Sequence, residues 1–200
     1  MIEIINVTKI IKEKEVLKNI NLELENGKIY LLKGHNGCGK TMLLRLICGF
    51  IKATKGEIKY EKNYSFGVII ENPAFFLHET GFYNLKYLAD INKKIDDELI
   101  NDELKKFGLY DVKDRKVKTY SLGMRQRLAI CQAFMENPDV ILLDEPFNAI
   151  DEENLNIVFQ VLREEKKKNK IIVIASHGEV TSLKFDKIIK MSDGRIIKNK

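Results

Sequence analysis

The chain has 200 residues, which is enough for a single domain with a buried core. Hydrophobic residues make up 44% of it and charged residues 32%, a composition that excludes the disordered and fibrous classes of protein. The net charge of +5 comes from lysines interleaved with acids, including a run at Lys166–Lys170 typical of a solvated helix end, so we expect no nucleic acid partner.

Alternating apolar and polar side chains in the first third of the chain predict strands, and a change of spacing predicts one helix. The predicted strands lie within residues 1–33, at Val16–Glu25 and Lys28–Lys33, and then at Gly56–Tyr60 and Phe66–Ile70. Between them, Thr41–Phe50 has its leucines at helical spacing, with Gly49 near its end as a stop.

From Thr80 to Met135 the sequence is highly charged with apolar residues at helical spacing, and Gly108 is suited to cap a helix there. The remaining predictions are strands at Val140–Leu143 and Lys170–Ala175, a helix at Asn154–Lys168, and a hairpin of Lys187–Met191 with Arg195–Lys198. Strands that alternate with helices indicate an α/β fold with a mostly parallel sheet. We therefore predict one domain, residues 1–200, with an inserted helical subdomain at about 80–135.

The cysteines Cys38, Cys48 and Cys131 lack a Cys-x-x-Cys spacing, so we expect neither disulfides nor a zinc site. Cys48 and Cys131 are predicted to be buried thiols, whereas Cys38 is expected to be accessible to alkylation. The apolar runs are shorter than the roughly 20 residues of a membrane helix, and Met1–Ile5 does not resemble an export signal. We therefore expect the protein in the cytoplasm.

The segment Gly34-His35-Asn36-Gly37-Cys38-Gly39-Lys40-Thr41 matches the phosphate-binding pattern G-x-x-x-x-G-K-[ST]. It follows a predicted strand and opens a predicted helix, the context in which backbone amides cradle phosphate at a helix N-terminus. Lys40 is predicted to contact the β- and γ-phosphates of ATP, and the Thr41 hydroxyl to ligate Mg²⁺. The predicted nucleotide-binding residues of this segment are Gly34, Asn36, Gly37, Cys38, Gly39, Lys40, Thr41 and Met42.

Two carboxylates end the apolar run Val140–Glu145. At the carboxyl end of a parallel strand, Asp144 can hold Mg²⁺ and its water shell. Glu145, one residue further, can orient or deprotonate the attacking water. We therefore predict Asp144 as a metal ligand and Glu145 as a catalytic residue.

Between these motifs stands Tyr120-Ser121-Leu122-Gly123-Met124, which resembles the Leu-Ser-Gly-Gly-Gln signature of ATP-binding cassette (ABC) proteins. Tyr120 and Leu122 depart from the leucine and the first glycine of that signature. Ser121 is a natural helix N-cap, so the helix that follows presents its positively polarised N-terminus to whatever lies in front of it. The resemblance implies that Ser121, Gly123 and Met124 face the γ-phosphate of ATP bound to an opposing subunit.

The resemblance covers essentially the whole chain and implies a P-loop NTPase core with antiparallel N-terminal strands, the ABC ATPase fold. Asn148-Ala149-Ile150-Asp151 looks like the family's D-loop, in which Asp151 links the two sites of a dimer. His177, after the last core strand, looks like the family's switch histidine. Its implied role is a hydrogen bond to the γ-phosphate that polarises the attacking water together with Glu145.

The function that the resemblance implies is that of the ATP-hydrolysing subunit of a membrane transporter, with ATP and Mg²⁺ as cofactors. In this family, two cassettes form a head-to-tail dimer around two ATP molecules. The second cassette would be either another copy of this chain or a different chain. Transmembrane permease subunits are the implied partners, and they would hold the dimer at the inner face of the membrane.

Two positions depart from the family's usual residues. Glu71 stands where most members carry a glutamine that reaches Mg²⁺; a glutamate keeps an oxygen for the metal, loses an N–H donor and adds negative charge. This glutamate and the Tyr-Ser-Leu-Gly-Met signature resemble the subgroup that exports bacitracin-like and lantibiotic peptides. Ile11 stands where an aromatic residue usually stacks on adenine, so we expect it to pack against the base with modest selectivity.

A soluble cassette ATPase acting in DNA repair or translation is the alternative function. Repair members carry a long coiled-coil insertion, for which the segment between Lys40 and Ser121 is too short, and translation members usually join two cassettes. A nucleotide sensor that does not hydrolyse is a further alternative, against which Glu145 and His177 argue. We therefore favour an ATPase that powers export through a permease, with a peptide antibiotic or lantibiotic as the cargo hypothesis.

Overall fold

The computed structural model describes residues 1–71, 74–178 and 180–197, which contain nine strands, five α-helices and two short 3-10 helices. The strands are β1 (Ile2–Ile11), β2 (Lys14–Leu24), β3 (Lys28–Lys33), β4 (Lys55–Tyr60), β5 (Phe66–Ile69), β6 (Val140–Asp144), β7 (Ile171–Ser176), β8 (Lys187–Ser192) and β9 (Arg195–Ile197). The helices are α1 (Lys40–Ile47), α2 (Gly81–Asn92), α3 (Asp97–Lys106), η1 (Tyr110–Val112), η2 (Val117–Thr119), α4 (Leu122–Phe134) and α5 (Glu152–Lys167). Within these described ranges, no helix is long and apolar enough to cross a membrane.

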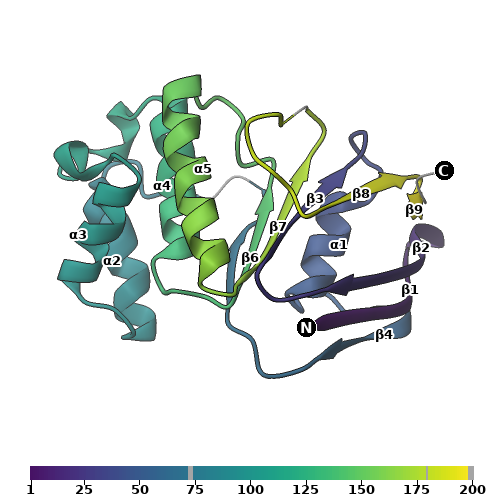
Figure 1. Ribbon diagram of the computed structural model, residues 1–200. Coiled ribbons are helices and arrows are strands. Elements are labelled where there is room, and N and C mark those ends of the chain that lie inside the picture. The colour runs from purple at the N-terminus through teal and green to yellow at the C-terminus, as the bar shows by residue number, and fades with distance from the viewer. Residues whose placement is uncertain (72–73, 179, 198–200) are drawn as a thin grey trace.

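The strands form two sheets, which Figure 1 shows with the smaller one beside the C-terminal strands. The smaller sheet is antiparallel and has the order β2-β1-β4. The larger has the order β5-β6-β7-β3-β8-β9, in which the first five strands are parallel and β9 pairs antiparallel with β8. The predicted α/β fold, with a mostly parallel sheet and antiparallel N-terminal strands, is confirmed.

Each face of the larger sheet is covered by a separate hydrophobic core. In β3, Ile29 and Leu31 face the core shared with α4 and α5, whereas Tyr30 and Leu32 face α1 and the smaller sheet. All four side chains are at most 3% exposed. Figure 1 shows α4 and α5 on one side of β6 and β7, with α1 on the other. Because apolar cores cover both faces of β3, β6 and β7, polar residues can reach solvent only where these strands end.

Some observed element ends differ from the predicted ones by a few residues. α1 ends at Ile47, earlier than predicted, because Gly49 has a φ of 76° and turns the chain out of the helix. α5 begins at Glu152, also earlier than predicted, because the Asp151 side chain caps the helix at that point. The last residue of the predicted C-terminal hairpin, Lys198, lies outside the described residues.

The stretch predicted to be helical is divided into α2, α3 and α4, joined by turns and the two 3-10 helices. Gly108, with a φ of 62°, follows the end of α3 as predicted. Ile100, Leu104 and Phe107 of this region are fully buried in the core that also contains α4 and α5. The division of the chain into one domain with an inserted helical subdomain at residues 80–135 stays a prediction.

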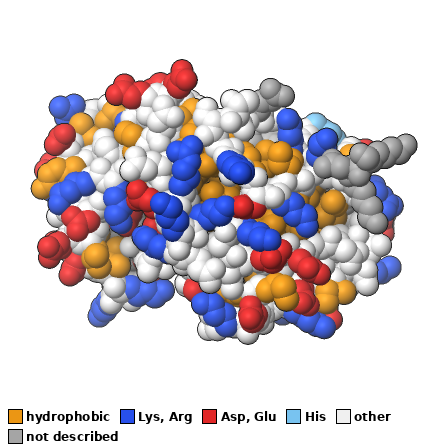
Figure 2. Space-filling model, in the orientation of Figure 1, with side chains coloured by type: hydrophobic (Ala, Val, Ile, Leu, Met, Phe, Trp, Pro, Cys, Tyr) orange, Lys and Arg blue, Asp and Glu red, His pale blue; other side chains and the backbone are white. Residues whose placement is uncertain are grey.

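The basic run Lys166–Lys170 is not wholly solvated, contrary to the prediction. Lys170 is only 6% exposed and pairs with the Glu165 carboxylate, which also accepts a hydrogen bond from Lys168 at 2.6 Å. Burial alone would raise the pKa of the Glu165 carboxyl, but the two lysines outweigh burial and the pKa is lowered. Figure 2 shows basic and acidic side chains lying close together across one face of the molecule.

Candidate active site

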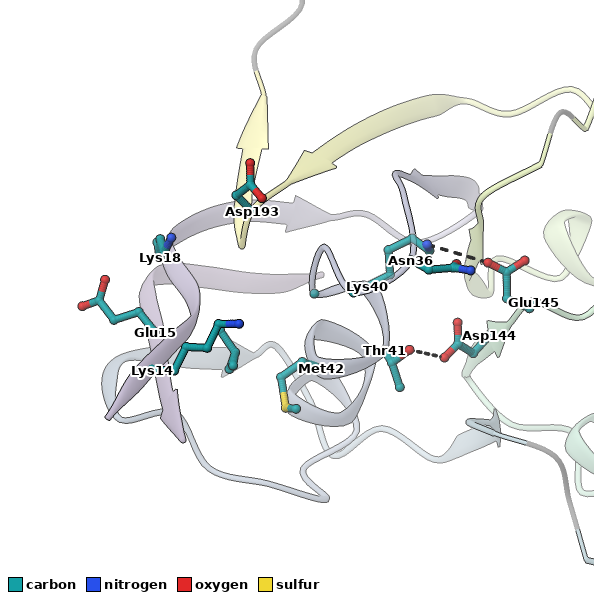
Figure 3. A pocket seen from close by; sticks show the side chains of 13 residues that line it. Lys14, Glu15, Lys18, Asn36, Lys40, Thr41, Met42, Asp144, Glu145 and Asp193 are labelled. Carbon is teal, nitrogen blue, oxygen red and sulfur yellow. Dashed lines mark hydrogen bonds and ion pairs between the residues drawn. The ribbon is translucent and has the colours of Figure 1, made fainter. Parts of the chain in front are cut away.

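The phosphate loop lies between β3 and α1, at the carboxyl end of the central strand (Figure 3). Gly39 directly precedes α1 with a φ of 109°, and no side-chain hydrogen bond caps the start of this helix. The first amides of α1 are therefore left to bind an anion. A cavity of about 380 Å³ adjoins the loop and is lined by Lys14, Glu15, Val16, Lys18, Asn36, Gly37, Gly39, Lys40, Thr41, Met42, Asp144, Glu145 and Asp193.

The loop is packed tightly against β2 and the β8–β9 turn. A Cβ on Gly34 would lie 2.4 Å from the Met191 carbonyl oxygen and 2.6 Å from Cys38 Sγ, so only glycine fits there. The Gly194 amide donates a hydrogen bond to the Cys38 carbonyl oxygen at 3.0 Å. Gly34 and Cys38 are the two predicted nucleotide-binding residues that do not line the cavity, and they pack on the side of the loop that faces the protein interior. Because its side chain packs inward, Cys38 is only 1% exposed, and the prediction that it is accessible is wrong.

Lys40 is the first residue of α1 and lies folded back over the loop. Its Nζ donates to the Gly34 carbonyl oxygen at 2.7 Å and lies 3.7 Å from Glu145 Oε1, a contact drawn in Figure 3. Only 5% of the residue is exposed. The ammonium group is therefore a fixed positive charge inside the cavity, suited to the oxygens of a polyphosphate.

Thr41 and Asp144 join the helix after the loop to the strand β6. The Thr41 hydroxyl donates to Asp144 Oδ2 at 2.5 Å. Burial raises the pKa of the Asp144 carboxyl; the hydrogen bond from Thr41 lowers it, and the charge of Glu145 adds to the rise. A hydroxyl and a carboxylate beside a phosphate site are the hard oxygen donors that Mg²⁺ takes, so these two residues fit that ion.

Glu145 lies in the left-handed backbone region, with a φ of 48°, directly after β6. Its Oε1 accepts a hydrogen bond from the His177 backbone amide at 3.0 Å and lies 2.8 Å from His177 Nδ1. Its Oε2 is buried and has no hydrogen-bond partner among the described residues. Because Glu145 lines the cavity, its carboxylate is the group there that can accept a proton from a bound water.

Glu71 follows β5 with a φ of 69° and does not line the cavity. Its carboxylate pairs with the guanidinium of Arg45, which lies on α1 one turn after Thr41. Arg45 was not predicted as a site residue from the sequence. The signal for it was the spacing of four residues from Thr41, which places both side chains on one face of the helix.

The signature residues Ser121, Gly123 and Met124 lie at the start of α4, and none of them lines the cavity. The Ser121 hydroxyl caps α4 by accepting a hydrogen bond from the Met124 amide at 3.1 Å, as predicted. A Cβ on Gly123 would lie 2.7 Å from the Ala149 carbonyl oxygen, so the signature packs directly on the predicted D-loop. The structure thus brings the signature to the D-loop of its own chain, and not to its own phosphate loop.

Asp151 is the N-cap of α5 and does not line the cavity either. Its carboxylate accepts a hydrogen bond from the Asn154 amide at 2.9 Å. This bond is the largest cause that holds the pKa of the Asp151 carboxyl below its usual value. It follows Ile150, whose Cα would lie 3.7 Å from a Cβ on Gly123 of the signature segment.

Ile11 is 39% exposed at the end of β1 and is not among the residues that line the cavity. The described lining at that end comes instead from the start of β2 and from Met42. Sequence reasoning missed Asp193 as a cavity residue, although the Asp-Gly pair predicted a turn there. Lys18 donates its amide to the Gly194 carbonyl oxygen at 2.8 Å, which holds that turn against β2 and beside the loop.

A family profile described as "ABC transporter" matches residues 17–148. The uncharacterized ABC transporter ATP-binding protein YybJ of Bacillus subtilis is 44% identical over 98% of this chain and 94% of its own length. The lantibiotic transport ATP-binding protein SrtF of Streptococcus pyogenes is 32% identical over 100% of this chain and 90% of its own length. The bacitracin transport ATP-binding protein BcrA of Enterococcus faecalis is 34% identical over 98% of this chain and 68% of its own length.

Solved structures share the fold. The dimeric structure of MJ0796, described as a bacterial ABC transporter cassette, has a TM-score of 0.88 and 25% identity over 99% of this chain and 97% of that one. CbiO1 of Clostridium perfringens, part of the ABC transporter complex cbiONQ, has a TM-score of 0.84 and 24% identity, and the match covers 98% of this chain and 86% of that one.

Because the pKa of the Asp144 carboxyl is raised, the stability of the folded protein should depend on this residue and on pH. The ionised carboxylate destabilises the folded protein above that pKa, so Asp144→Asn should raise the free energy of unfolding of the nucleotide-free protein at pH 7.5 by about 0.5–2 kcal/mol. The gain should shrink as the pH falls through the raised pKa and vanish below about 4, where the unfolded carboxyl is also protonated. Urea denaturation across this pH range measures it.

Asp139→Asn is the matched control with the opposite sign. The Lys62 ammonium, 2.6 Å away, and the Ser65 amide lower the pKa of the Asp139 carboxyl to about 2. That substitution should destabilise the protein at pH 7.5. An Asp144→Asn variant that is less stable than wild type would contradict the cost assigned to the buried carboxylate.

Proposed function

Because this chain belongs to the ABC transporter family, we propose that its ATPase activity is carried out with Mg²⁺ by two facing cassettes, and that it drives export through a separate membrane permease. The chain is the ATP-binding and ATP-hydrolysing subunit of such a transporter. The observation that carries the proposal is the cluster at the end of β6, where Glu145 lies 3.7 Å from Lys40 and 2.8 Å from His177. It supplies a positive charge for phosphate and an acceptor for the proton of a water.

We assign each residue a step in hydrolysis. The amides at the start of α1 and the Lys40 ammonium bind the β- and γ-phosphates. Thr41 and Asp144 would hold Mg²⁺, which when bound neutralises charge on the phosphate oxygens. The Glu145 carboxylate, which lines the cavity and is held through Oε1 by the His177 amide, accepts the proton of the attacking water.

A second cassette is proposed to complete each site. The signature segment lies away from the cavity of its own chain, so its capped helix end can meet only the nucleotide of another subunit. Leu122, in the middle of that segment, is 65% exposed, which suits a residue that a partner covers. The relative MJ0796 was solved as a dimer. Asp151, at the neighbouring helix start, is proposed to contribute to the same contact.

The permease is proposed to dock on an exposed aromatic patch, which we define as Phe76, Leu77, Tyr83 and Tyr87. These side chains are between 44% and 50% exposed. The ring centroids of Phe76 and Tyr87 are 5.1 Å apart, and those of Tyr83 and Tyr87 are 6.4 Å apart. Aromatic side chains gathered at a surface are typical of a protein interface.

The cargo is proposed to be a peptide antibiotic or lantibiotic, and the direction export. SrtF and BcrA are named for lantibiotic and bacitracin transport, and the first of them is covered almost entirely by this chain. Glu71 and the Tyr-Ser-Leu-Gly-Met signature support the same subgroup. Binding to the permease would hold the chain at the inner face of the membrane.

The catalytic role of Glu145 is tested by Glu145→Gln. The amide cannot accept the proton of the attacking water, so the rate of phosphate release should fall about 10²–10⁴-fold while ATP binding persists. Release measured by a coupled phosphate assay gives the rate. Glu153→Gln, on the exposed side of α5, is the control and should leave the rate unchanged. Equal rates for wild type and Glu145→Gln would remove the assigned role.

The partner and cargo are tested by the double substitution Tyr83→Ser and Tyr87→Ser. We expect about tenfold less membrane permease to co-purify from solubilised host membranes, because two interface aromatics are lost. The same cells should become sensitive to bacitracin or a lantibiotic, while the ATPase rate of the isolated protein is unchanged. Tyr110→Ser, 39% exposed and outside the aromatic patch, is the matched control. If the permease co-purified normally with the double variant, the aromatic patch would not be its docking site. If co-purification were lost while resistance stayed unchanged, the cargo would not be the antibiotic tested.

A further inference from the structure

The helix α1 meets the acidic edge of the larger sheet at two successive turns. At the first turn, the Thr41 hydroxyl binds Asp144 at 2.5 Å. At the second, the Arg45 guanidinium pairs with the Glu71 carboxylate. The helix is therefore connected to β6 through Asp144 and to the end of β5 through Glu71.

Glu71 stands close to the metal side of the site. Ile69 of β5 pairs with Leu143 of β6 in parallel register, so Glu71 and Glu145, each two residues further along, leave the sheet at the same edge. The charge of Glu71 is among the causes that raise the pKa of the Asp144 carboxyl, after burial and Glu145. Three carboxylates thus share this edge. Their combined negative charge is unfavourable unless cations offset it.

The contact between Arg45 and Glu71 is exposed and therefore weak. Glu71 has 69% of its side chain exposed and Arg45 has 30%. Exposed ion pairs contribute little to stability because water and salt screen them. A divalent cation bound beside Asp144 attracts the same carboxylate with twice the charge. The pair can therefore be exchanged for the metal at small cost.

We propose that Arg45 is a positioning residue for the metal side of the site: it holds the Glu71 carboxylate against α1 in the nucleotide-free protein and gives it up when Mg²⁺ arrives with the nucleotide. Arg45 and the metal then compete for one carboxylate, so Arg45 sets the Mg²⁺ concentration at which nucleotide binds. The inference rests on the proposed function, since it takes Thr41 and Asp144 as the residues that hold the metal.

The test is a Mg²⁺ titration of nucleotide binding, with a fluorescent non-hydrolysable ATP analogue at fixed concentration. Arg45→Met should lower the Mg²⁺ midpoint about two- to fivefold, the range expected for removing an exposed competing charge. Arg45→Lys keeps the charge and should stay within about twofold of wild type. In a Glu71→Gln background, which has no carboxylate to compete for, Arg45→Met should change the midpoint less than about 1.5-fold. Lys105→Met, which removes another exposed, ion-paired cation, is the charge control.

The outcomes separate this inference from the proposed function. No shift for Arg45→Met, a shift to higher Mg²⁺, or equal shifts in the two backgrounds would overturn the competition between Arg45 and the metal while the ATPase proposal stands. Wild-type protein that does not bind the analogue, or binds it equally without Mg²⁺, would overturn both. Thermal melting of each variant checks that the fold is kept, and because the readout is binding, a change in catalysis alone does not move it.

Discussion

Three neighbouring parallel strands, β6, β7 and β3, end at one edge of the larger sheet, and the phosphate loop, the two carboxylates and His177 all follow these ends. Inside the sheet both faces of the strands are covered by apolar cores, so no charge can be placed there without a large desolvation cost. The first positions at which polar chemistry is possible are those just past the strand ends. The hydrogen bond between Thr41 and Asp144 then ties the helix after the loop to the strand beside it. The rest of the site depends on this shared edge.

The edge is assembled at a cost in stability. The Asp144 carboxyl has a raised pKa because it is buried, Glu145 has a positive φ, and one oxygen of Glu145 is buried without a partner. Each of these features is unfavourable in the protein alone, and a cation beside the carboxylates would offset the charge part of the cost. The site is therefore built for the bound state, and the nearby positive charges of Lys40 and Arg45 offset part of the cost until a ligand arrives.

The sequence predicted most of the fold, because its apolar residues have clear strand or helical spacing and its glycines stand at turns. It also predicted the chemistry of the loop and of β6, because those motifs are local. What it could not predict depends on which strands become neighbours. Cys38 faces inward because β8 lies against the loop, Lys170 is buried beside Glu165, and Asp193 reaches the cavity only because β9 is held near β2. The pairing of Arg45 with Glu71 likewise needs the register of β5 on β6.

The central claim is that one chain supplies the phosphate loop and another the signature of each active site. The most direct test is to mix two inactive variants, Lys40→Ala and Ser121→Arg, and to measure the ATPase rate of the mixture. Each variant alone lacks an essential half of every site, but a mixed dimer holds one intact site made from Lys40 of one chain and Ser121 of the other. With random mixing, about a quarter of the wild-type rate should return, since half of the dimers are mixed and each has one of two sites. A Ser121→Arg variant as active as wild type, or a mixture with no recovered rate, would contradict the account.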